Sequence, residues 1–199
     1  MYGSAVFDQI HYKPNRILYS ERSQSLGLYI VTKGYFKLVK TGNDGKDQII
    51  KIASEGDLLG YTEIISDTTH TTSAVAIADA IVNFIPKEDF LRLYNENSDL
   101  RNNITRQLCR DVQLAESKIV SIAYMPVRGR LAEALLEVAE DSTVVHIKRE
   151  DLANLIGTAK ETVIRLLSEL KKSNIIAIKG REINVLNSNA LNRISMQYH

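Results

Sequence analysis

The spacing of apolar residues along the 199-residue chain changes twice, which indicates three regions. In the first region, short runs rich in β-branched and aromatic residues alternate with turn-forming Gly, Asn and Asp, as in antiparallel strands. These runs are Leu28–Val31, Tyr35–Val39, Gln48–Ile52 and Ser73–Phe84. Short strands separated by turns predict a β-sandwich or barrel rather than a parallel sheet.

The second region predicts one long helix, because no Gly or Pro occurs from about Ser98 to Ile122. Its apolar residues recur four and three apart, the spacing of a helix–helix seam. The seam could pack on the β region, but a narrow stripe on a helix between two domains favours a second copy of the chain. The helix should end before Pro126, with a hinge at Tyr124–Val127. The predicted seam consists of Leu108, Val112, Ala115, Ile119 and Ile122.

The third region predicts helices followed by a hairpin. Arg130–Ala139 has helical spacing, Glu150–Ile156 ends at Gly157, and a longer amphipathic helix follows. A short helix, a glycine turn and a longer helix form the helix-turn-helix unit that binds DNA. Ile175–Ile178 and Glu182–Leu186, joined by Lys179-Gly180-Arg181, predict a β-hairpin beside it. The apolar face of the longer helix carries Val163, Leu166, Leu167 and Leu170.

Charge is unevenly distributed although the whole chain carries only +1. Residues 142–199 hold nine Lys or Arg against five Asp or Glu, whereas residues 1–141 hold sixteen against nineteen. A basic end on an acidic body is the electrostatic pattern of a nucleic-acid-binding domain.

The polar face of the longer helix carries the groups that read bases. Arg165 can bond guanine through two donors, Glu161 can accept from cytosine, and Lys160 reaches a base or a phosphate. Other roles stay open for the same residues: Thr158 and Glu161 fit a capping box, and Glu161 and Arg165 fit a surface ion pair. Lys179 and Arg181 of the hairpin could contact phosphates.

The sequence gives little support for disulfide, metal or catalytic sites. One cysteine, Cys109, excludes a disulfide framework and a cysteine-ligated cluster, and we expect a buried free thiol. The four histidines are scattered, and His70 is expected in an exposed loop. No phosphate loop, His pair at metal-binding spacing or nucleophile motif is present, so we expect no enzymatic activity, metal or cofactor.

No apolar run would span a membrane and no signal segment opens the chain, which predicts a cytoplasmic protein.

The stretch IKREDLANLIGTAKETVIRLLSELKKSNIIAIKGREINVLN resembles the winged helix of the Crp/Fnr regulators, and AYMPVRGRLAEALLEVAE resembles their hinge and first DNA-domain helix. LYIVTKGYFKLVK, GNDGK and EGDLLG resemble their cyclic-nucleotide-binding, cupin-like β-roll. The resemblance implies an α+β fold with a β-roll sensor at 1–97, a dimerisation helix and hinge at 98–124, and a winged helix-turn-helix at 125–199. The family's leading helix is expected to be short or absent.

The resemblance also implies residue roles in DNA binding. Glu161 and Arg165 match the family's base-reading Glu and Arg, and Lys160 stands where a relative has Arg. Ile164 stands where relatives have Gly or Ser, so it could add contact with a thymine methyl group. Thr162 would contact a phosphate. Lys148 replaces the usual Thr cap of the first helix, which puts that cap in doubt.

The sensor pocket departs from the family pattern. Thr72 precedes Ser73 where an Arg would hold the cyclic phosphate, and Tyr61 follows Gly60 where a Glu would hold the ribose. An alternative alignment makes Glu63 that Glu, with Thr62 beside it. On the long helix, a separate alignment on Lys118 and Ala123 puts Ala115-Glu116 where the family's sensor contacts adenine. No Lys or Arg lies between Lys51 and Lys87, although a buried phosphate needs a cation.

We therefore predict a homodimer that regulates transcription on a pseudo-palindromic operator and does not respond to cyclic AMP in the usual way. Its expected partners are double-stranded DNA, a second copy, RNA polymerase, and an unknown effector or none. The alternative is an effector-sensing module whose winged helix contacts proteins.

Overall fold

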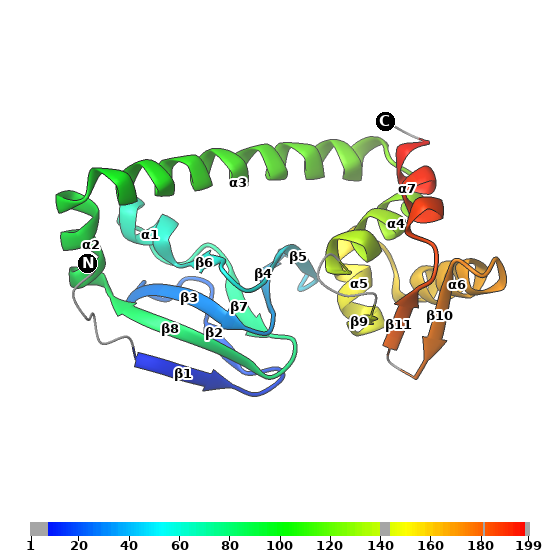
Figure 1. Cartoon of the computed structure of the whole chain (residues 1–199), viewed down its shortest axis with the longest axis horizontal. Coiled ribbons are helices and arrows are strands. Elements are labelled where there is room, and N and C mark those ends of the chain that lie inside the picture. The colour runs from blue at the N-terminus through cyan, green and yellow to red at the C-terminus, as the bar shows by residue number, and fades with distance from the viewer. Residues whose placement is uncertain (1–7, 140–143, 181, 198–199) are drawn as a thin grey trace. The chain divides into compact units, whose positions relative to one another are not determined.

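The computed structural model describes residues 8–139, 144–180 and 182–197 (Figure 1). The chain divides into two compact units, residues 1–46 with 50–113 and residues 47–49 with 114–199. Among the described residues, no helix combines the length and apolar character that crossing a bilayer requires.

The first unit is built on two antiparallel four-stranded sheets. One has the strand order β1-β8-β3-β6, and the other has the order β2-β7-β4-β5. The strands are β1 Asp8–Tyr12, β2 Ile17–Tyr19, β3 Gly27–Lys33, β4 Phe36–Thr41, β5 Asp47–Ala53, β6 Leu58–Leu59, β7 Ser73–Ala76 and β8 Ala80–Pro86.

Side chains from both sheets form one apolar core. Tyr29 and Val31 of β3 pack with Phe36 of β4 and Ala74 of β7. The rings of Tyr12 and Phe36 meet edge to face with centroids 5.7 Å apart. Facing sheets bury alternate residues of each strand, which is why the strands read as apolar runs broken by polar positions. The predicted antiparallel β-sandwich or barrel, as opposed to a parallel sheet, is confirmed.

The predicted run Ser73–Phe84 contains two strands rather than one, because the chain turns at residues 77–79 between β7 and β8. The Ile77 amide donates to the Tyr35 carbonyl at this turn. β1, β2 and two short helices escaped the sequence analysis. The helices are α1 Tyr61–Ser66 and α2 Lys87–Glu96. They pack against α3 in a second cluster that buries Phe90 and Ile104.

The long helix α3 spans Ser98–Tyr124, which confirms the predicted helix and its end before Pro126. Four of the five predicted seam residues are exposed, with exposed fractions of 56% for Val112, 67% for Ile119 and 44% for Ile122. Leu108 instead packs against the Phe90 cluster. Cys109 is exposed, so the expectation of a buried thiol is wrong. It lies one position beyond Leu108 and faces away from that cluster.

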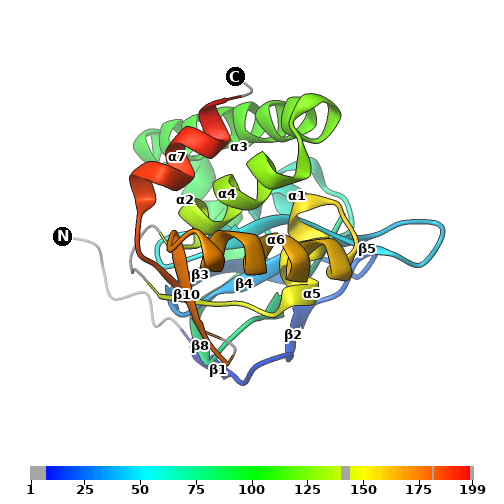
Figure 2. The same cartoon turned by 90° about the vertical axis from the view of Figure 1, so that its right-hand side faces the viewer.

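The second unit contains the predicted helices and hairpin. Its strands form a three-stranded antiparallel sheet of order β10-β11-β9. Figure 2 shows α7 alongside α4, and the two helices are in contact. The elements are α4 Val127–Val138, β9 Val144–His146, α5 Arg149–Ile156, α6 Lys160–Lys172, β10 Ile176–Lys179, β11 Glu182–Val185 and α7 Ser188–Met196.

Candidate nucleic-acid interface and sensor pocket

Helix α6 buries one face and exposes the other. Val163, Leu166, Leu167 and Leu170, spaced as i, i+3, i+4 and i+7, are all buried. Glu161 lies in the first turn and Lys171 and Lys172 in the last, which suits the helix dipole. Gly157 ends α5 with φ 65°, a left-handed conformation that glycine adopts without steric cost. These features give the two helices a tight turn and an outward polar face.

That outward face carries the predicted base-reading residues. Lys160, Glu161 and Arg165 are exposed, and Ile164 exposes 47% of its surface. Thr162 is half-buried. The four base-reading candidates, Lys160, Glu161, Ile164 and Arg165, therefore lie exposed on one face of α6.

Two local roles considered for these residues are wrong. Ala159, not Thr158, precedes α6, and it makes no side-chain capping bond, so the capping box does not form. Arg165 Nη1 donates to Glu169 Oε1 at 2.7 Å, one turn towards the C-terminus, instead of pairing with Glu161. Glu161 therefore makes neither of the local contacts that would explain its position on this face.

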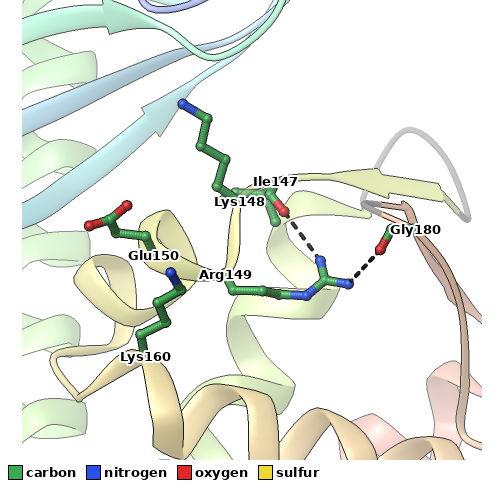
Figure 3. A pocket seen from close by; sticks show the side chains of 6 residues that line it. All are labelled: Ile147, Lys148, Arg149, Glu150, Lys160 and Gly180. Carbon is green, nitrogen blue, oxygen red and sulfur yellow. Dashed lines mark hydrogen bonds between the residues drawn. The ribbon is translucent and has the colours of Figure 1, made fainter.

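The hairpin β10–β11 is tied to the start of α5 by Arg149. Its guanidinium donates to the Ile147 carbonyl at 3.4 Å and to the Gly180 carbonyl in the hairpin turn at 3.3 Å (Figure 3). Burial lowers the pKa of Arg149. Lys148 precedes α5 and makes no side-chain capping bond, which agrees with the doubt raised by Lys in place of the usual Thr.

A hollow of about 260 Å³ lies beside this contact, lined by Ile147, Lys148, Arg149, Glu150, Lys160 and Gly180. The lining contains three cationic side chains and one acidic side chain, Glu150, so its net positive charge favours an anionic group in the hollow. Lys179 is exposed at the end of β10, and Arg181 lies outside the described residues.

In the first unit, Gly60 and Tyr61 occupy a constrained junction. Gly60 has φ 82°, and a Cβ on it would lie 2.9 Å from the Gly27 carbonyl oxygen, so the position requires glycine. Tyr61 opens α1, and its hydroxyl donates to Asp111 Oδ2 of α3 at 2.7 Å. Burial and this hydrogen bond raise the pKa of Tyr61.

Asp111 has further partners that sequence reasoning missed. Lys51 Nζ donates to Asp57 Oδ1 at 2.9 Å and to Asp111 Oδ1 at 3.4 Å, and Gln107 Nε2 donates to Asp111 at 3.0 Å. Burial lowers the pKa of Lys51, but the two carboxylates outweigh it and raise the pKa overall. The Lys51 ammonium is therefore paired with two carboxylates within the protein, those of Asp57 and Asp111.

Glu63 is buried, with 7% of its surface exposed, and its carboxylate is held by neighbouring hydroxyls. Thr62 Oγ1 donates to Oε2 at 2.7 Å, and Thr71 Oγ1 donates to Oε1 at 3.1 Å. Burial alone raises the pKa of Glu63, but His70, Thr62 and backbone donors outweigh it and lower the pKa to about 2. The carboxylate is stabilised as an anion inside the fold.

His70 is buried with 1% of its surface exposed, so the expectation of an exposed loop histidine is wrong. Its ring stacks on Tyr19 with centroids 3.7 Å apart, and Nδ1 lies 3.7 Å from Glu63 Oε2. That separation is long for a hydrogen bond, so we treat the pair as an electrostatic contact. The aromatic partner comes from β2, a strand that the sequence analysis did not predict.

The other predicted pocket residues are less closely joined. Ser73 Oγ accepts from the Glu21 amide at 2.9 Å, and Thr72 is half-buried. Glu116 is exposed on α3, whereas the contact from α3 to Tyr61 comes from Asp111. Asp111 lies fifty residues from Tyr61 and belongs to no short motif, whereas Asp57 stands in the stretch EGDLLG just before α1.

Both units match known protein families. Residues 9–97 match the cyclic nucleotide-binding domain, and residues 129–194 match the Crp-like helix-turn-helix domain. The chain is 26% identical over 186 residues to the cAMP-activated global transcriptional regulator CRP of Salmonella typhimurium, covering 88% of this chain and 89% of that protein. The chain belongs to the Crp/Fnr family of DNA-binding transcription regulators.

The chain is also similar to a second curated protein and to a solved structure. The fumarate and nitrate reduction regulatory protein of Yersinia pestis is 26% identical over 187 residues, covering 89% of this chain and 74% of that protein. The structure of FixK2 from Bradyrhizobium japonicum is 23% identical with a TM-score of 0.86, covering 95% of this chain and 97% of that chain. The recognised α+β fold of the family is thereby confirmed.

Proposed function

We propose that this Crp/Fnr protein acts as a homodimer on a pseudo-palindromic operator and does not respond to cyclic AMP. The observation that carries the DNA-reading part is the exposed face of α6 above its buried stripe. Arg165 reads guanine, Glu161 accepts from cytosine, Ile164 contacts a thymine methyl group, and Lys160 reaches a base or phosphate. Thr162, Lys179 and Arg181 contact phosphates and fix the register.

The exposed seam of α3 supports the homodimer. Val112, Ile119 and Ile122 expose large apolar surface at seam spacing, and burial of each such side chain is worth roughly 1.5–3 kcal/mol. A second copy buries the same stripe symmetrically. Two recognition helices then meet half-sites one helical turn of DNA apart.

The charges of the sensor unit support the negative proposal on cyclic AMP. The relatives named for cyclic AMP activation bind an anionic nucleotide. Here Glu63 is a buried anion already supplied with donors, and Lys51 is occupied by Asp57 and Asp111. A phosphate near Glu63 would add a second negative charge, and residues 52–86 contain no Lys or Arg to compensate it, which is unfavourable. An effector, if one acts here, is of a different chemical class.

Selection of bound duplexes from random DNA tests the first part of the proposal. We expect a two-fold-related consensus whose retention falls steeply with salt. Enrichment without any consensus would contradict sequence-specific recognition. Equilibrium dialysis tests the second part, and micromolar binding of cyclic AMP would contradict it.

Sedimentation of the Ile119→Glu variant tests the dimer. A buried charge on each subunit opposes the seam, so we expect monomers and loss of operator binding. Leu114→Glu is the matched control, since Leu114 is equally exposed but lies off the seam. A dimeric Ile119→Glu protein would place the subunit contact elsewhere.

A further inference from the structure

Arg130 lies in the first turn of α4 and reaches three carbonyl groups in separate segments of the second unit. Its Nη1 donates to the Ile122 carbonyl at 2.8 Å and to the Met125 carbonyl at 3.1 Å. Its Nη2 donates to the Gly157 carbonyl at 3.4 Å. One side chain therefore contacts the end of α3, the hinge and the turn between α5 and α6.

The first two carbonyls need a donor because of the hinge sequence. In a continuing helix the Ile122 carbonyl would accept from the amide four residues later, but that residue is Pro126, which has no N–H. The Met125 carbonyl lies at the same break, where the Gly129 and Arg130 amides donate to Pro126 instead. Arg130 supplies the donors that the backbone lacks.

The third carbonyl links this hinge to the DNA-reading part. Gly157 is the left-handed residue that ends α5 and leads into α6. A guanidinium is planar and its donors are fixed relative to one another, so it restrains the segments it joins in direction as well as distance. A second link, from Ser121 Oγ to Glu133 Oε2 at 3.0 Å, holds α3 against α4.

The Arg130 side chain is partly buried. Burial lowers the pKa of Arg130, and its Nε is buried without a hydrogen-bond partner among the described residues. Hydrogen bonds from a charged donor are stronger than neutral ones. The three carbonyls therefore supply acceptors for Nη1 and Nη2, while part of the side chain stays exposed to solvent.

We infer that Arg130 is a positioning residue that fixes the helix-turn-helix against the end of the dimerisation helix. This inference rests on the proposed homodimer with two half-sites. Without the clamp, each recognition helix still reads its own half-site, but the two helices lose the fixed separation that lets both bind at once. Arg130 therefore governs binding to paired half-sites and leaves single half-sites unaffected.

The test compares two duplexes. One is the consensus that the wild-type protein selects from random DNA, and the other has one of its halves scrambled. We expect Arg130→Gln to lose at least tenfold in affinity on the intact duplex and less than twofold on the scrambled one. Arg130→Lys should lose nearly as much, because an ammonium keeps the charge but not the fork. The control Arg193→Gln removes an exposed charge from α7 and should change neither.

Equal losses on both duplexes, or full rescue by Arg130→Lys, would overturn the inference, since they would indicate damage to the reading face or a simple charge effect. Failure of the wild-type protein to select any consensus would instead overturn the proposed function. A distance measurement made without DNA tests the inference independently of the proposed function.

Nitroxide labels at Val120→Cys and Ser168→Cys, in a Cys109→Ser background with excess unlabelled subunits, report the distance from α3 to α6 within one chain. Both labelled positions are exposed. We expect Arg130→Gln and Arg130→Lys to broaden the distance distribution relative to Arg193→Gln. Unchanged widths in both Arg130 variants would overturn the inference whatever the DNA results.

Discussion

The polar side chains of α6 and those around α1 are organised in opposite ways. On α6, Lys160, Glu161 and Arg165 are exposed, and the one ion pair among them, from Arg165 to Glu169, is at the surface. Around α1, Glu63 and Tyr61 are buried and bonded to partners inside the fold. Exposed pairs are worth little and exchange readily, whereas a buried pair is costly to break. The first region is suited to meet a charged partner, whereas the charged groups of the second are already bonded within the protein.

The largest expected effect is on the exposed face. Arg165→Ala removes a bidentate base contact worth roughly 1–3 kcal/mol, so specific affinity should fall about tenfold to a hundredfold for each half-site. Competition between selected and scrambled duplexes measures it. The fold and the dimer should be unaffected, because Arg165 contacts only Glu169 on its own helix. An unchanged sequence preference would remove Arg165 from base reading.

The buried region should respond in stability rather than in DNA affinity. The pKa of Glu63 is lowered from 4.5 to about 2, so its contribution to stability is present above about pH 4.5 and is lost as the pH falls towards 2. Glu63→Gln should cost on the order of 2 kcal/mol at pH 7 and roughly half as much at pH 3. Urea unfolding at both pH values measures this, with Glu55→Gln, an exposed site, as control. A pH-independent loss would mean that packing, not charge, holds Glu63.

The smallest expected effect is on the hairpin. Lys179→Ala should weaken binding a few-fold on selected and scrambled duplexes alike, because a phosphate contact carries no sequence information. The slope of log affinity against log salt should fall by about one per subunit. A loss confined to the selected duplex would show that Lys179 reads bases.

Sequence periodicity sufficed for the elements with strong repeats. The stripe Val163 to Leu170 predicted α6, and the seam spacing with Pro126 predicted α3 and its end. It failed for α1 and β2, whose six and three residues are too few to show a period, and for β1, which is mostly polar. It also failed for Cys109 and His70, because exposure depends on which neighbours pack nearby.

By itself the sequence determined the family, the long helix α3 and the exposed polar face of α6, since each follows from local spacing or a contiguous motif. The tertiary structure alone decided that Tyr61 pairs with Asp111, fifty residues away, that His70 is buried against Tyr19, and that Arg130 joins α3 to Gly157. These contacts leave no periodic trace, because folding brings together residues whose separation in the chain is arbitrary. The sensor pocket was therefore recognisable by position, and the bonds that hold its charged groups became visible only in the tertiary structure.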